Sequence, residues 1–268
     1  MSKLNRALDA LRAFLTHPTD SNADTLGPYL AADVVVSVHT TNENGREAAI
    51  KALQQSLFHN VVYGGQWGDP ESDGDTVTQL LSMPEKAIAS GCAFRFSFND
   101  AMEVREIFGE WKLPPAQLTA ERVALTTAMR NKINSAQEQG MPVLLAYLTA
   151  AGSPEQMYRS SIQVHGDDQL AFWNPRPNGS FLESVSGNPQ LSAIYRDSVT
   201  HEMMELSGRA RIVDDESEAR AIYDARQDVV SKDDPGRSGV AVVVDIDRIT
   251  GLIHSAETGA IERILMAR

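Results

Sequence analysis

Cysteine, positive charge and long apolar runs are all scarce in this chain of 268 residues. Cys92 is the only cysteine, which excludes an intrachain disulfide and a metal site built from several cysteines. Lysine and arginine number 24 against 36 aspartates and glutamates, and the net charge of −12 argues against nucleic acid and anionic membrane surfaces as partners. No apolar run approaches the roughly 18 residues that cross a bilayer. We therefore expect a cytoplasmic protein that binds a small molecule.

Several catalytic and metal-binding motifs are also missing. The segment YGGQWGDP lacks the glycine spacing and the following helix of a phosphate-binding loop, and no Gly-x-Ser-x-Gly elbow occurs. The segment HEMME, at residues 201–205, looks like half of a zinc-protease helix but has no second histidine. Met204 and Leu206 continue an even apolar spacing, which favours a strand. We expect no metal site.

The first part of the chain has helical patterns followed by strand patterns. The spacing of Leu4, Leu8, Leu11 and Leu15 indicates an amphipathic helix at the start rather than a signal peptide. A meander of long strands after helices favours an α+β unit in which a curved sheet wraps around the helices. The expected helices are Ser2–Thr16, Asn22–Ala31 and Gly45–Phe58, and the expected strands are Asp33–His39, Asn60–Gly68, Asp75–Pro84, Lys86–Asn99 and Ala101–Ile107.

The pattern changes at Leu113-Pro114-Pro115, because proline interrupts both helices and strand ladders. We expect three segments: a domain at 1–112, a linker with one helix between Thr119 and Gly140 within 113–140, and a second domain at 141–268. Many short strands with few helices favour a small antiparallel barrel in the second domain. Its expected strands are Val143–Ala150, Tyr158–His165, Gln169–Asn174, Leu191–Tyr195, His201–Val213 and Gly239–Asp247, with helices at Ser180–Val185 and Glu216–Asp224.

One regular hairpin stands out in the second domain, SSIQVHGDDQLAFWN at residues 160–174. Ile162 and Val164 share a face on its first arm, and Leu170 and Phe172 share a face on its second. This period-two alternation around Gly-Asp-Asp is typical of a half-buried antiparallel pair. One face covers a core, and the other face and the outer ends remain for a ligand.

These patterns carry two resemblances to known families. Residues from about 4 to 112, with AADVVVSVHTTNENGREAAIKAL and GCAFRFSF, resemble the SnoaL-like members of the nuclear transport factor 2-like superfamily, whose sheet and helices form a cone. Residues from about 125 to 253 resemble the pyridoxamine 5'-phosphate oxidase-like family of FMN-binding split barrels, through the hairpin, VSGNPQLSAIYRDS and MMELSGRARIVDDESEARAIYD. The resemblances imply an α+β protein: a cone-shaped domain followed by an antiparallel split β-barrel.

The second resemblance also implies a set of cofactor-binding residues. Arginine forks and hydroxyl donors satisfy a phosphate dianion well. The family usually has a Ser-x-Lys whose lysine also holds the phosphate, but no lysine lies between Lys132 and Lys232 here, and Arg176 with Ser180 could substitute. The implied residues are Arg159, Ser160 and Ser161 on the phosphate side, Gln163 toward the isoalloxazine, and Trp173 and Asn174 after the next strand.

Other candidate residues have simpler interpretations. Cys92 lies in GCAFRFSF and is expected to fill a core. Asp245 and Asp247 share a strand face beside Arg248 and are expected to be solvated. In the first domain, His39, Trp67 and Asp69 could line a cone pocket, where a carboxylate would act as a general base.

The sequence favours an FMN-dependent oxidoreductase, in which the flavin performs the redox chemistry. Two alternatives remain open: a nonenzymatic binder of flavin, deazaflavin or haem, and an isomerase- or hydratase-like site in the first domain. Whether the protein is an enzyme, and which residues would be catalytic, is not decided by the sequence. We also expect a homodimer, because two-fold pairing is the commonest way to bury the apolar surface that such domains leave.

Overall fold

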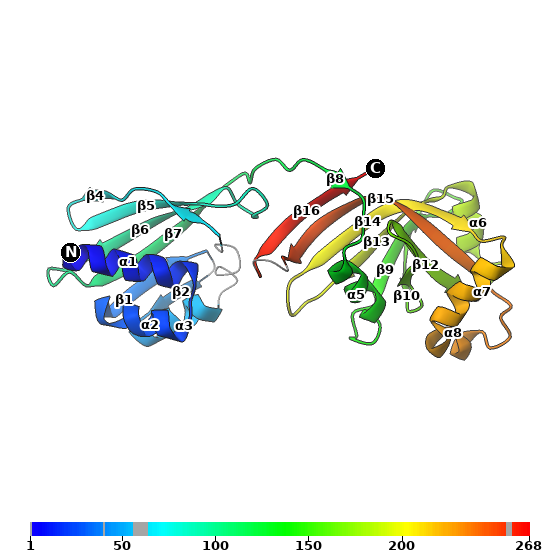
Figure 1. The fold of residues 1–268 in the computed structure, drawn as a ribbon, viewed down its shortest axis with the longest axis horizontal. Coiled ribbons are helices and arrows are strands. Elements are labelled where there is room, and N and C mark those ends of the chain that lie inside the picture. Colours follow the sequence, from blue (N-terminus) through cyan, green and yellow to red (C-terminus); the bar gives the residue numbers. More distant parts are fainter. Residues whose placement is uncertain (1, 40, 56–63, 256–258) are drawn as a thin grey trace. The chain divides into compact units, whose positions relative to one another are not determined.

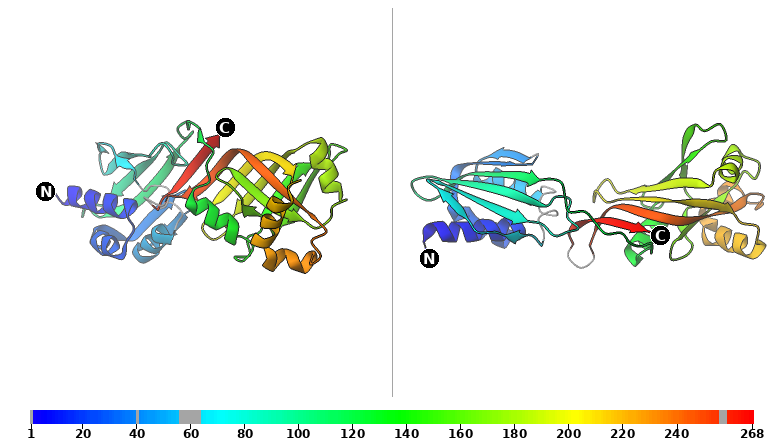
Figure 2. Two further views of the ribbon diagram at one scale, coloured as in Figure 1. Left: turned by 45° about the vertical axis from the view of Figure 1, so that its right-hand side comes forward. Right: turned by 90° about the horizontal axis from the view of Figure 1, so that it is seen from above.

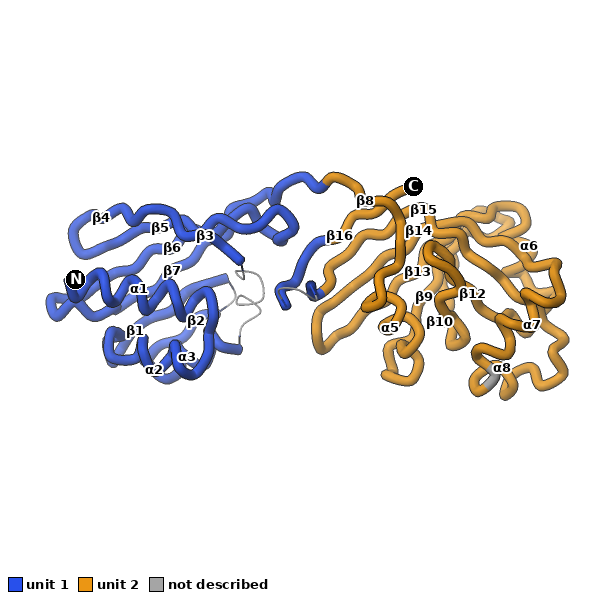
Figure 3. Tube along the Cα trace, viewed as in Figure 1, with its two compact units in different colours: residues 1–118, 254–263 blue, residues 119–253, 264–268 orange. Residues whose placement is uncertain are grey.

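The computed structural model describes residues 2–39, 41–55, 64–255 and 259–268, and it separates into two compact units (Figure 3). Unit 1 contains residues 1–118 and 254–263, and unit 2 contains residues 119–253 and 264–268. Both units combine helices with sheets, so the predicted α+β class is confirmed. Within the described residues, no helix has the length and apolar character that a membrane span requires.

Unit 1 packs three helices against one face of a seven-stranded sheet (Figures 1 and 2). The sheet has the order β2-β1-β7-β6-β5-β3, with β4 paired to β5, and β1–β7 is the one parallel pairing among its described residues. The elements are α1 Lys3–Thr16, α2 Asp20–Leu26, the 3-10 turn η1 Gly27–Tyr29, β1 Leu30–Val38, β2 Thr41–Asn44, α3 Arg46–Gln55, β3 Gln66–Trp67, β4 Glu71–Asp73, β5 Thr76–Ser82, β6 Gly91–Phe98 and β7 Val104–Lys112.

Local chemistry explains where these elements begin. The side chain of Ser2 caps α1 by accepting a hydrogen bond from the backbone of Asn5, and Thr19 caps α2 in the same way. The apolar stripe of α1, including Leu11 and Phe14, is fully buried against the sheet. The first predicted helix is therefore confirmed.

Two other predictions in unit 1 need correction. The helix predicted at 22–31 ends at Leu26, because Pro28 lies in the following 3-10 turn and β1 begins at Leu30. The strand predicted at 86–99 begins only at Gly91, after a turn in which the backbone of Ala87 bonds to Pro84. Residues 60–63 of the strand predicted at 60–68 and the end of the helix predicted to reach Phe58 lie outside the described residues, and the described part of that strand contains β3.

Unit 2 is built on a nine-stranded sheet with the order β10-β9-β13-β14-β15-β12-β11, and β16 pairs with both β15 and β8. Along this path β10 and β11 are the two ends, so the described residues form no closed barrel. The elements are β8 Glu121–Arg122, α5 Thr127–Ser135, β9 Val143–Leu148, β10 Pro154–Arg159, β11 Gln163–Val164, β12 Gln169–Asn174, α6 Ser180–Gly187, β13 Gln190–Arg196, β14 Met203–Ile212, α7 Glu216–Ala225, α8 Gln227–Asp233, β15 Val240–His254 and β16 Ile261–Ala267.

Helices cover the unit 2 sheet in two places. Helices α5 and α6 contribute Met129, Ile133 and Phe181 to the larger core cluster, while α7 and α8 pack Tyr223 and Val230 against β12 and β15 in a second cluster. The segment predicted as a helix between Thr119 and Gly140 is helical only over Thr127–Ser135. Thr126 caps that helix, and the preceding residues form β8 and an extended stretch. Helix α8 and strand β16 were not predicted.

The strand predicted at 158–165 is interrupted in the structure, so this prediction is wrong. Strand β10 ends at Arg159, which pairs with Val143 of β9, and residues 160–161 turn the chain before β11 pairs Gln163 with Ala171 of β12. The hairpin partners are therefore β9–β10 and β11–β12. This break places Arg159 at a strand end beside Asn174, the last residue of β12.

Candidate functional site

Two neighbouring cavities in unit 2 share Arg159, Pro175 and Asp233. The large cavity has a volume of about 600 Å³ and is lined by Tyr147, Met157, Arg159, Asn174, Pro175, Arg176, Gly179, Ser180, Phe181 and Asp233. The small cavity has a volume of about 140 Å³ and is lined by Tyr158, Arg159, Ser160, Ser161, Trp173, Pro175, Val229, Val230 and Asp233. Of the predicted residues, four line the large cavity and four line the small one, with Arg159 common to both.

The guanidinium group of Arg159 is held between aromatic rings and an amide. Its Nη2 donates a 3.0 Å hydrogen bond to Oδ1 of Asn174, and its central carbon lies 5.3 Å from the ring centroid of Phe172 and 5.2 Å from that of Phe181. Its Nε is buried and has no hydrogen-bond partner among the described residues. Contacts to ring faces position the charge but accept no conventional hydrogen bond from Nε.

The electrostatic surroundings of Arg159 are unusual for a buried charge. Its pKa is lowered, first by burial and further by the charge of Arg176, with Tyr147 acting in the opposite direction. No carboxylate among the described residues forms an ion pair with it, although buried charges are normally paired. Arg159 thus lines the cavity as a cation that has no carboxylate partner among the described residues.

Asn174 connects the two arginines. Its Oδ1 accepts from Arg159, while its Nδ2 donates a 2.8 Å hydrogen bond to the backbone carbonyl of Arg176. Both ends of this buried amide are used inside the protein. Asn174 therefore orients the cationic groups rather than contacting a ligand through its own side chain.

The start of helix α6 adds positive potential to the large cavity. The helix begins at Ser180, its N-cap residue is Gly179, and no side chain caps it. The backbone of Gly179 donates to the carbonyl of Arg176, which fixes the loop between β12 and the helix. The first N–H groups of a helix carry partial positive charge and attract anions. Arg159, Arg176 and the α6 start therefore surround the same space, with Asp233 as the one carboxylate residue on the lining.

The small cavity has a different character. Its lining includes Val229, Val230 and Asp233 from the C-terminal part of α8, where the helix dipole is negative. The hydroxyl of Ser161 donates to the backbone carbonyl of Trp173 and accepts from its backbone nitrogen, both at 3.2 Å. That hydroxyl joins two strand ends, and the small cavity is less suited to an anion than the large one.

Trp173 belongs to a buried polar network. Its indole Nε1 donates to Oδ2 of Asp234 at 2.9 Å, and its ring meets Tyr223 edge-on at 5.0 Å. Asp234 also accepts from the backbone and hydroxyl of Ser238 and from the backbone of Gly239. Burial alone raises the pKa of Asp234, but these donors more than offset it and lower that pKa to about 2. Trp173 thus forms part of the wall that supports the site.

Gln163, predicted to approach the flavin ring, has its side chain turned elsewhere. Its amide nitrogen donates a 2.8 Å hydrogen bond to the backbone carbonyl of Ile222 in α7, and the residue is buried. Gln163 lies in the hairpin that the sequence identified, but its side chain faces α7 and does not line the large cavity. A buried amide that satisfies a helix carbonyl is a structural contact.

The sequence interpretation missed six residues of the large cavity: Tyr147, Met157, Pro175, Gly179, Phe181 and Asp233. Tyr147 and Phe181 meet edge-on with their ring centroids 5.0 Å apart. The Tyr147 hydroxyl donates a 2.6 Å hydrogen bond to Oε2 of Glu155, its direct cross-strand neighbour. Burial and the bond to Glu155 raise the pKa of Tyr147 to about 12. The β9–β10 pairing, which was not predicted, brings Tyr147 and Met157 to the cavity, whereas Phe181 lies in α6 and Asp233 in α8.

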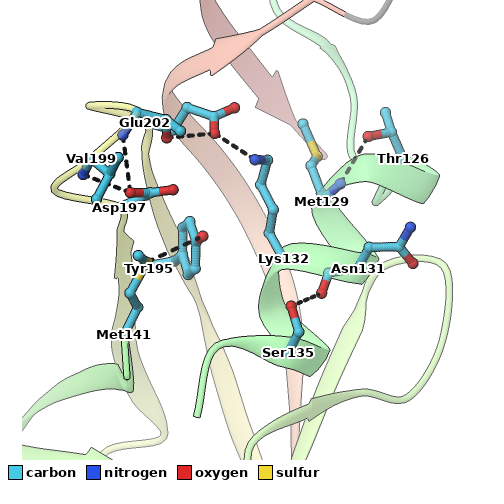
Figure 4. A network of polar contacts seen from close by, with 11 residues as sticks. Thr126, Met129, Asn131, Lys132, Ser135, Met141, Tyr195, Asp197, Val199 and Glu202 are labelled. Atoms are coloured by element: carbon cyan, nitrogen blue, oxygen red, sulfur yellow. Dashed lines mark hydrogen bonds and ion pairs between the residues drawn. The ribbon is translucent and has the colours of Figure 1, made fainter. Parts of the chain in front are cut away.

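The lysines on either side of the long lysine-free stretch do not supply the charge of the large cavity. Lys132 of α5 pairs with Glu202, which is 1% exposed and also accepts a 2.8 Å hydrogen bond from the Thr200 hydroxyl (Figure 4). Asp197 in the same loop accepts from the backbones of Val199 and Thr200. Lys232 is exposed on α8. The positive charge at the large cavity therefore comes from arginine.

The remaining candidates from the sequence have structural contacts. Cys92 is 1% exposed, and burial raises the pKa of its thiol to about 12, so the thiol is inert at neutral pH. Asp247 pairs with Arg209 at 2.9 Å, and Asp245 accepts from Gln169 at 2.6 Å. The strand prediction for the segment after His201 is confirmed by β14.

The three residues considered for a cone pocket are also placed. Trp67 packs its ring 5.2 Å from that of Phe94, and its Nε1 donates to the hydroxyl of Thr16 at 3.1 Å. His39 is exposed and meets Trp111 edge-on at 6.0 Å, and Asp69 is exposed in a loop. Trp67 therefore serves the core of unit 1, and the cone domain stays a prediction.

Comparisons with known proteins returned structural matches only. No protein-family model matches the chain, and no curated protein matches it. Among solved structures, HupZ from Group A Streptococcus is 17% identical with a TM-score of 0.39, covering 51% of this chain and 97% of that one. A putative pyridoxamine 5'-phosphate oxidase from Lactobacillus delbrueckii is 17% identical with a TM-score of 0.37, covering 47% and 93%. An FMN-binding protein from Syntrophomonas wolfei is 10% identical with a TM-score of 0.38, covering 46% and 84%. These matches are distant, and each spans about half of this chain.

Proposed function

We propose that unit 2 binds FMN in the large cavity and that the protein is a flavin-dependent oxidoreductase. The observation that carries the proposal is the half-buried guanidinium group of Arg159, which lines the large cavity, is held by Asn174 and has no carboxylate partner among the described residues. The cavity volume of about 600 Å³ lies within the range of about 300–1,000 Å³ typical of small-molecule sites.

A phosphate group satisfies this arrangement better than a neutral ligand. A buried charge without a counter-ion is costly, and a phosphate dianion supplies both the opposite charge and several acceptor oxygens. Arg159 brings one guanidinium group to the lining, and Arg176 on the same lining brings a second. Two planar donor forks suit a phosphate, which makes the missing lysine dispensable.

The phosphate is assigned to the α6 side of Arg159 rather than to the small cavity. Ser180 and the backbone start of α6 contribute hydrogen-bond donors and a favourable dipole there. Asp233 lines both cavities, so the difference lies in Arg176, Ser180 and the start of α6, which line only the large one. In this proposal Arg159, Arg176 and Ser180 contact the phosphate, Asn174 orients the arginines, and Ser160, Ser161, Gln163 and Trp173 hold the surrounding backbone.

The less polar lining would receive the organic part of the cofactor. Met157, Phe181 and Tyr147 provide apolar and aromatic surface next to the cationic groups. When bound, the flavin supplies hydride and single-electron transfer. The contribution of the chain is to bind the phosphate, exclude water from the apolar wall and keep the arginine charge in place.

Fluorescence titration of the full chain with FMN and with riboflavin tests the proposal. FMN should bind at least about 10-fold more tightly than riboflavin, because only FMN has the phosphate that meets the arginines. The advantage of FMN should shrink as salt is raised, since screening weakens charge interactions that water can reach. Equal affinity for the two flavins would refute the phosphate assignment.

Turnover separates an oxidoreductase from a flavin store. The FMN complex should be reduced anaerobically, and its reoxidation should be followed at the visible absorbance of the flavin with a panel of organic acceptors. The proposal expects at least one acceptor to reoxidise the bound flavin faster than it reoxidises FMN in solution. If the bound flavin were protected from every acceptor, the protein would be a nonenzymatic flavin binder.

A further inference from the structure

Tyr147 presents an acceptor, not a donor, to the large cavity. Its phenolic hydrogen is directed at Oε2 of Glu155, at an O–O distance of 2.6 Å. A carboxylate only accepts hydrogen bonds, so the tyrosine must be the donor in this pair. The lone pairs of its oxygen are then what a ligand can meet.

The position of the phenol ring is fixed on three sides. Tyr147 pairs with Glu155 across β9–β10 and with Leu191 across β9–β13, and its ring meets Phe181 edge-on. The residue is 5% exposed although it lines the cavity. A pKa of about 12 keeps the hydroxyl protonated throughout the physiological range. The oxygen is a preorganised acceptor.

The other polar side chains of the lining are exposed, offer only donors or are already used. Arg159 and Arg176 have donors alone, and the amide of Asn174 is satisfied at both ends. Asp233 is exposed, so it lies in contact with water. The charge of Arg159 acts on the Tyr147 hydroxyl, which indicates that the acceptor lies near the cationic end of the cavity. A ligand that suits both features has an anionic group and, beside it, a hydroxyl that can donate.

We propose that Tyr147, held by Glu155, is a specificity-determining residue that accepts a hydrogen bond from a ligand hydroxyl, so that the cavity selects hydroxylated phosphates over phosphates of equal charge without hydroxyls. The inference rests on the proposed function only for the position of the phosphate. In FMN the hydroxyls would be those of the ribityl chain, which lies between the phosphate and the ring.

Two small phosphates of similar size and charge test this selection without requiring a flavin. Glycerol 3-phosphate carries hydroxyls next to its phosphate, and propyl phosphate does not. The full chain should bind glycerol 3-phosphate roughly two- to tenfold more tightly in an NMR titration, the range expected for one hydrogen bond. In Tyr147→Phe the preference should fall to about one, while propyl phosphate should bind as it does to the wild type.

Tyr195→Phe is the matched control, because Tyr195 is also buried in unit 2, lies outside the lining of the large cavity, and donates its hydroxyl hydrogen to the sulfur of Met141 at 4.0 Å. This variant should keep the wild-type preference. A preference that survives in Tyr147→Phe, or that is absent from the wild type, would overturn the inference. FMN binding is measured alongside. If FMN did not bind but the preference for glycerol 3-phosphate remained, the flavin proposal would be rejected and the role of Tyr147 would be kept. If FMN bound but the preference for glycerol 3-phosphate were absent, only the role of Tyr147 would be rejected.

Discussion

Individual charges decide what a ligand meets in the large cavity. Arg159 and Arg176 favour an anion, whereas Asp233 opposes it from the lining. The net charge of these three lining residues is positive, because Asn174 holds Arg159 and the loop of Arg176 together without neutralising either guanidinium group. Each charge can be changed separately by mutation. One prediction concerns the charge of Asp233, and a second concerns the hydrogen-bond network of Asp234.

Removing the carboxylate of Asp233 should strengthen binding of a phosphate. Asp233→Asn keeps the side-chain volume and removes one unfavourable charge from the lining. Because Asp233 is exposed and the interaction is screened by solvent, we expect FMN to bind only about two- to fivefold more tightly. Asp228→Asn, on the same helix but outside the lining of both cavities, is the control in the fluorescence titration. An unchanged or weaker affinity in Asp233→Asn would place the phosphate elsewhere.

Asp234 should make folding stability depend on pH in the acidic range. Its pKa is about 2 in the folded protein and has an ordinary value of 3.8, so the folded state favours the ionised form. The stabilisation is therefore complete above pH 3.8 and is lost as the pH falls toward 2. At pH 7, Asp234→Asn should lower the free energy of unfolding by about 2 kcal/mol, from a pKa difference near two units. Urea denaturation should show this gap closing at low pH, and a gap that is constant with pH would contradict the assignment.

Secondary-structure elements were predicted best where a local rule sufficed. Helices α1, α6 and α7 have apolar stripes and clear starts, and the expected strands at β9, β13 and β14 were found with small shifts at their ends. The pairing of the strands was not predictable from such rules. Arg159 and Asn174 were identified from a resemblance, but Tyr147 and Asp233 reach the cavity only through β9–β10 pairing and through α8.

The segment around 160–163 shows why a periodic pattern can mislead. Ile162 and Val164 alternate with polar residues as in one continuous strand, yet the chain turns at 160–161 because β10 and β11 pair with different neighbours. A one-residue change in the path moves each side chain to the other face. Gln163 therefore contacts α7 through the Ile222 carbonyl rather than facing the large cavity.

At the element scale, the Lys132–Glu202 pair should hold α5 against the loop between β13 and β14 (Figure 4). Lys132→Met leaves the buried Glu202 without its cation and should destabilise the protein by about 3 kcal/mol in chemical denaturation. Replacing both residues, as Lys132→Met with Glu202→Leu, should recover much of the loss, because the carboxylate of Glu202 is then no longer buried without its cation. If Lys132→Met were as stable as the wild type, the hydrogen bond from Thr200 and contact with solvent would be enough to stabilise the charge of Glu202.

For the whole molecule, we propose a homodimer formed through the outer face of the unit 2 sheet. The register aligns Tyr158 with Leu144 and Leu144 with Ile194 across three strands, and Leu148 lies nearby on β9. Tyr158 is 69% exposed and Leu148 is 42% exposed, which leaves apolar surface on an edge strand and its neighbour.

The dimer is tested by light scattering at micromolar concentration. The wild type should have the mass of two chains, and Tyr158→Glu should have the mass of one, because a charge in the apolar stripe opposes burial. Glu183→Gln in α6, away from this face, is a control with a change of one charge. A monomeric wild type would contradict the dimer but not the proposed FMN site, because residues of one chain line the large cavity.

The most direct measurement of the central claim is the affinity of Arg159→Ala for FMN and for riboflavin. Charge-assisted hydrogen bonds contribute about 1.5–3 kcal/mol, so FMN should bind roughly 10- to 150-fold more weakly to the variant. Riboflavin should bind the wild type and Arg159→Ala equally, since it lacks the phosphate. Arg220→Ala, which removes an exposed arginine of α7, should bind both flavins as the wild type does. If FMN bound Arg159→Ala and the wild type alike, or bound neither at millimolar concentration, the phosphate site proposed for unit 2 would be wrong.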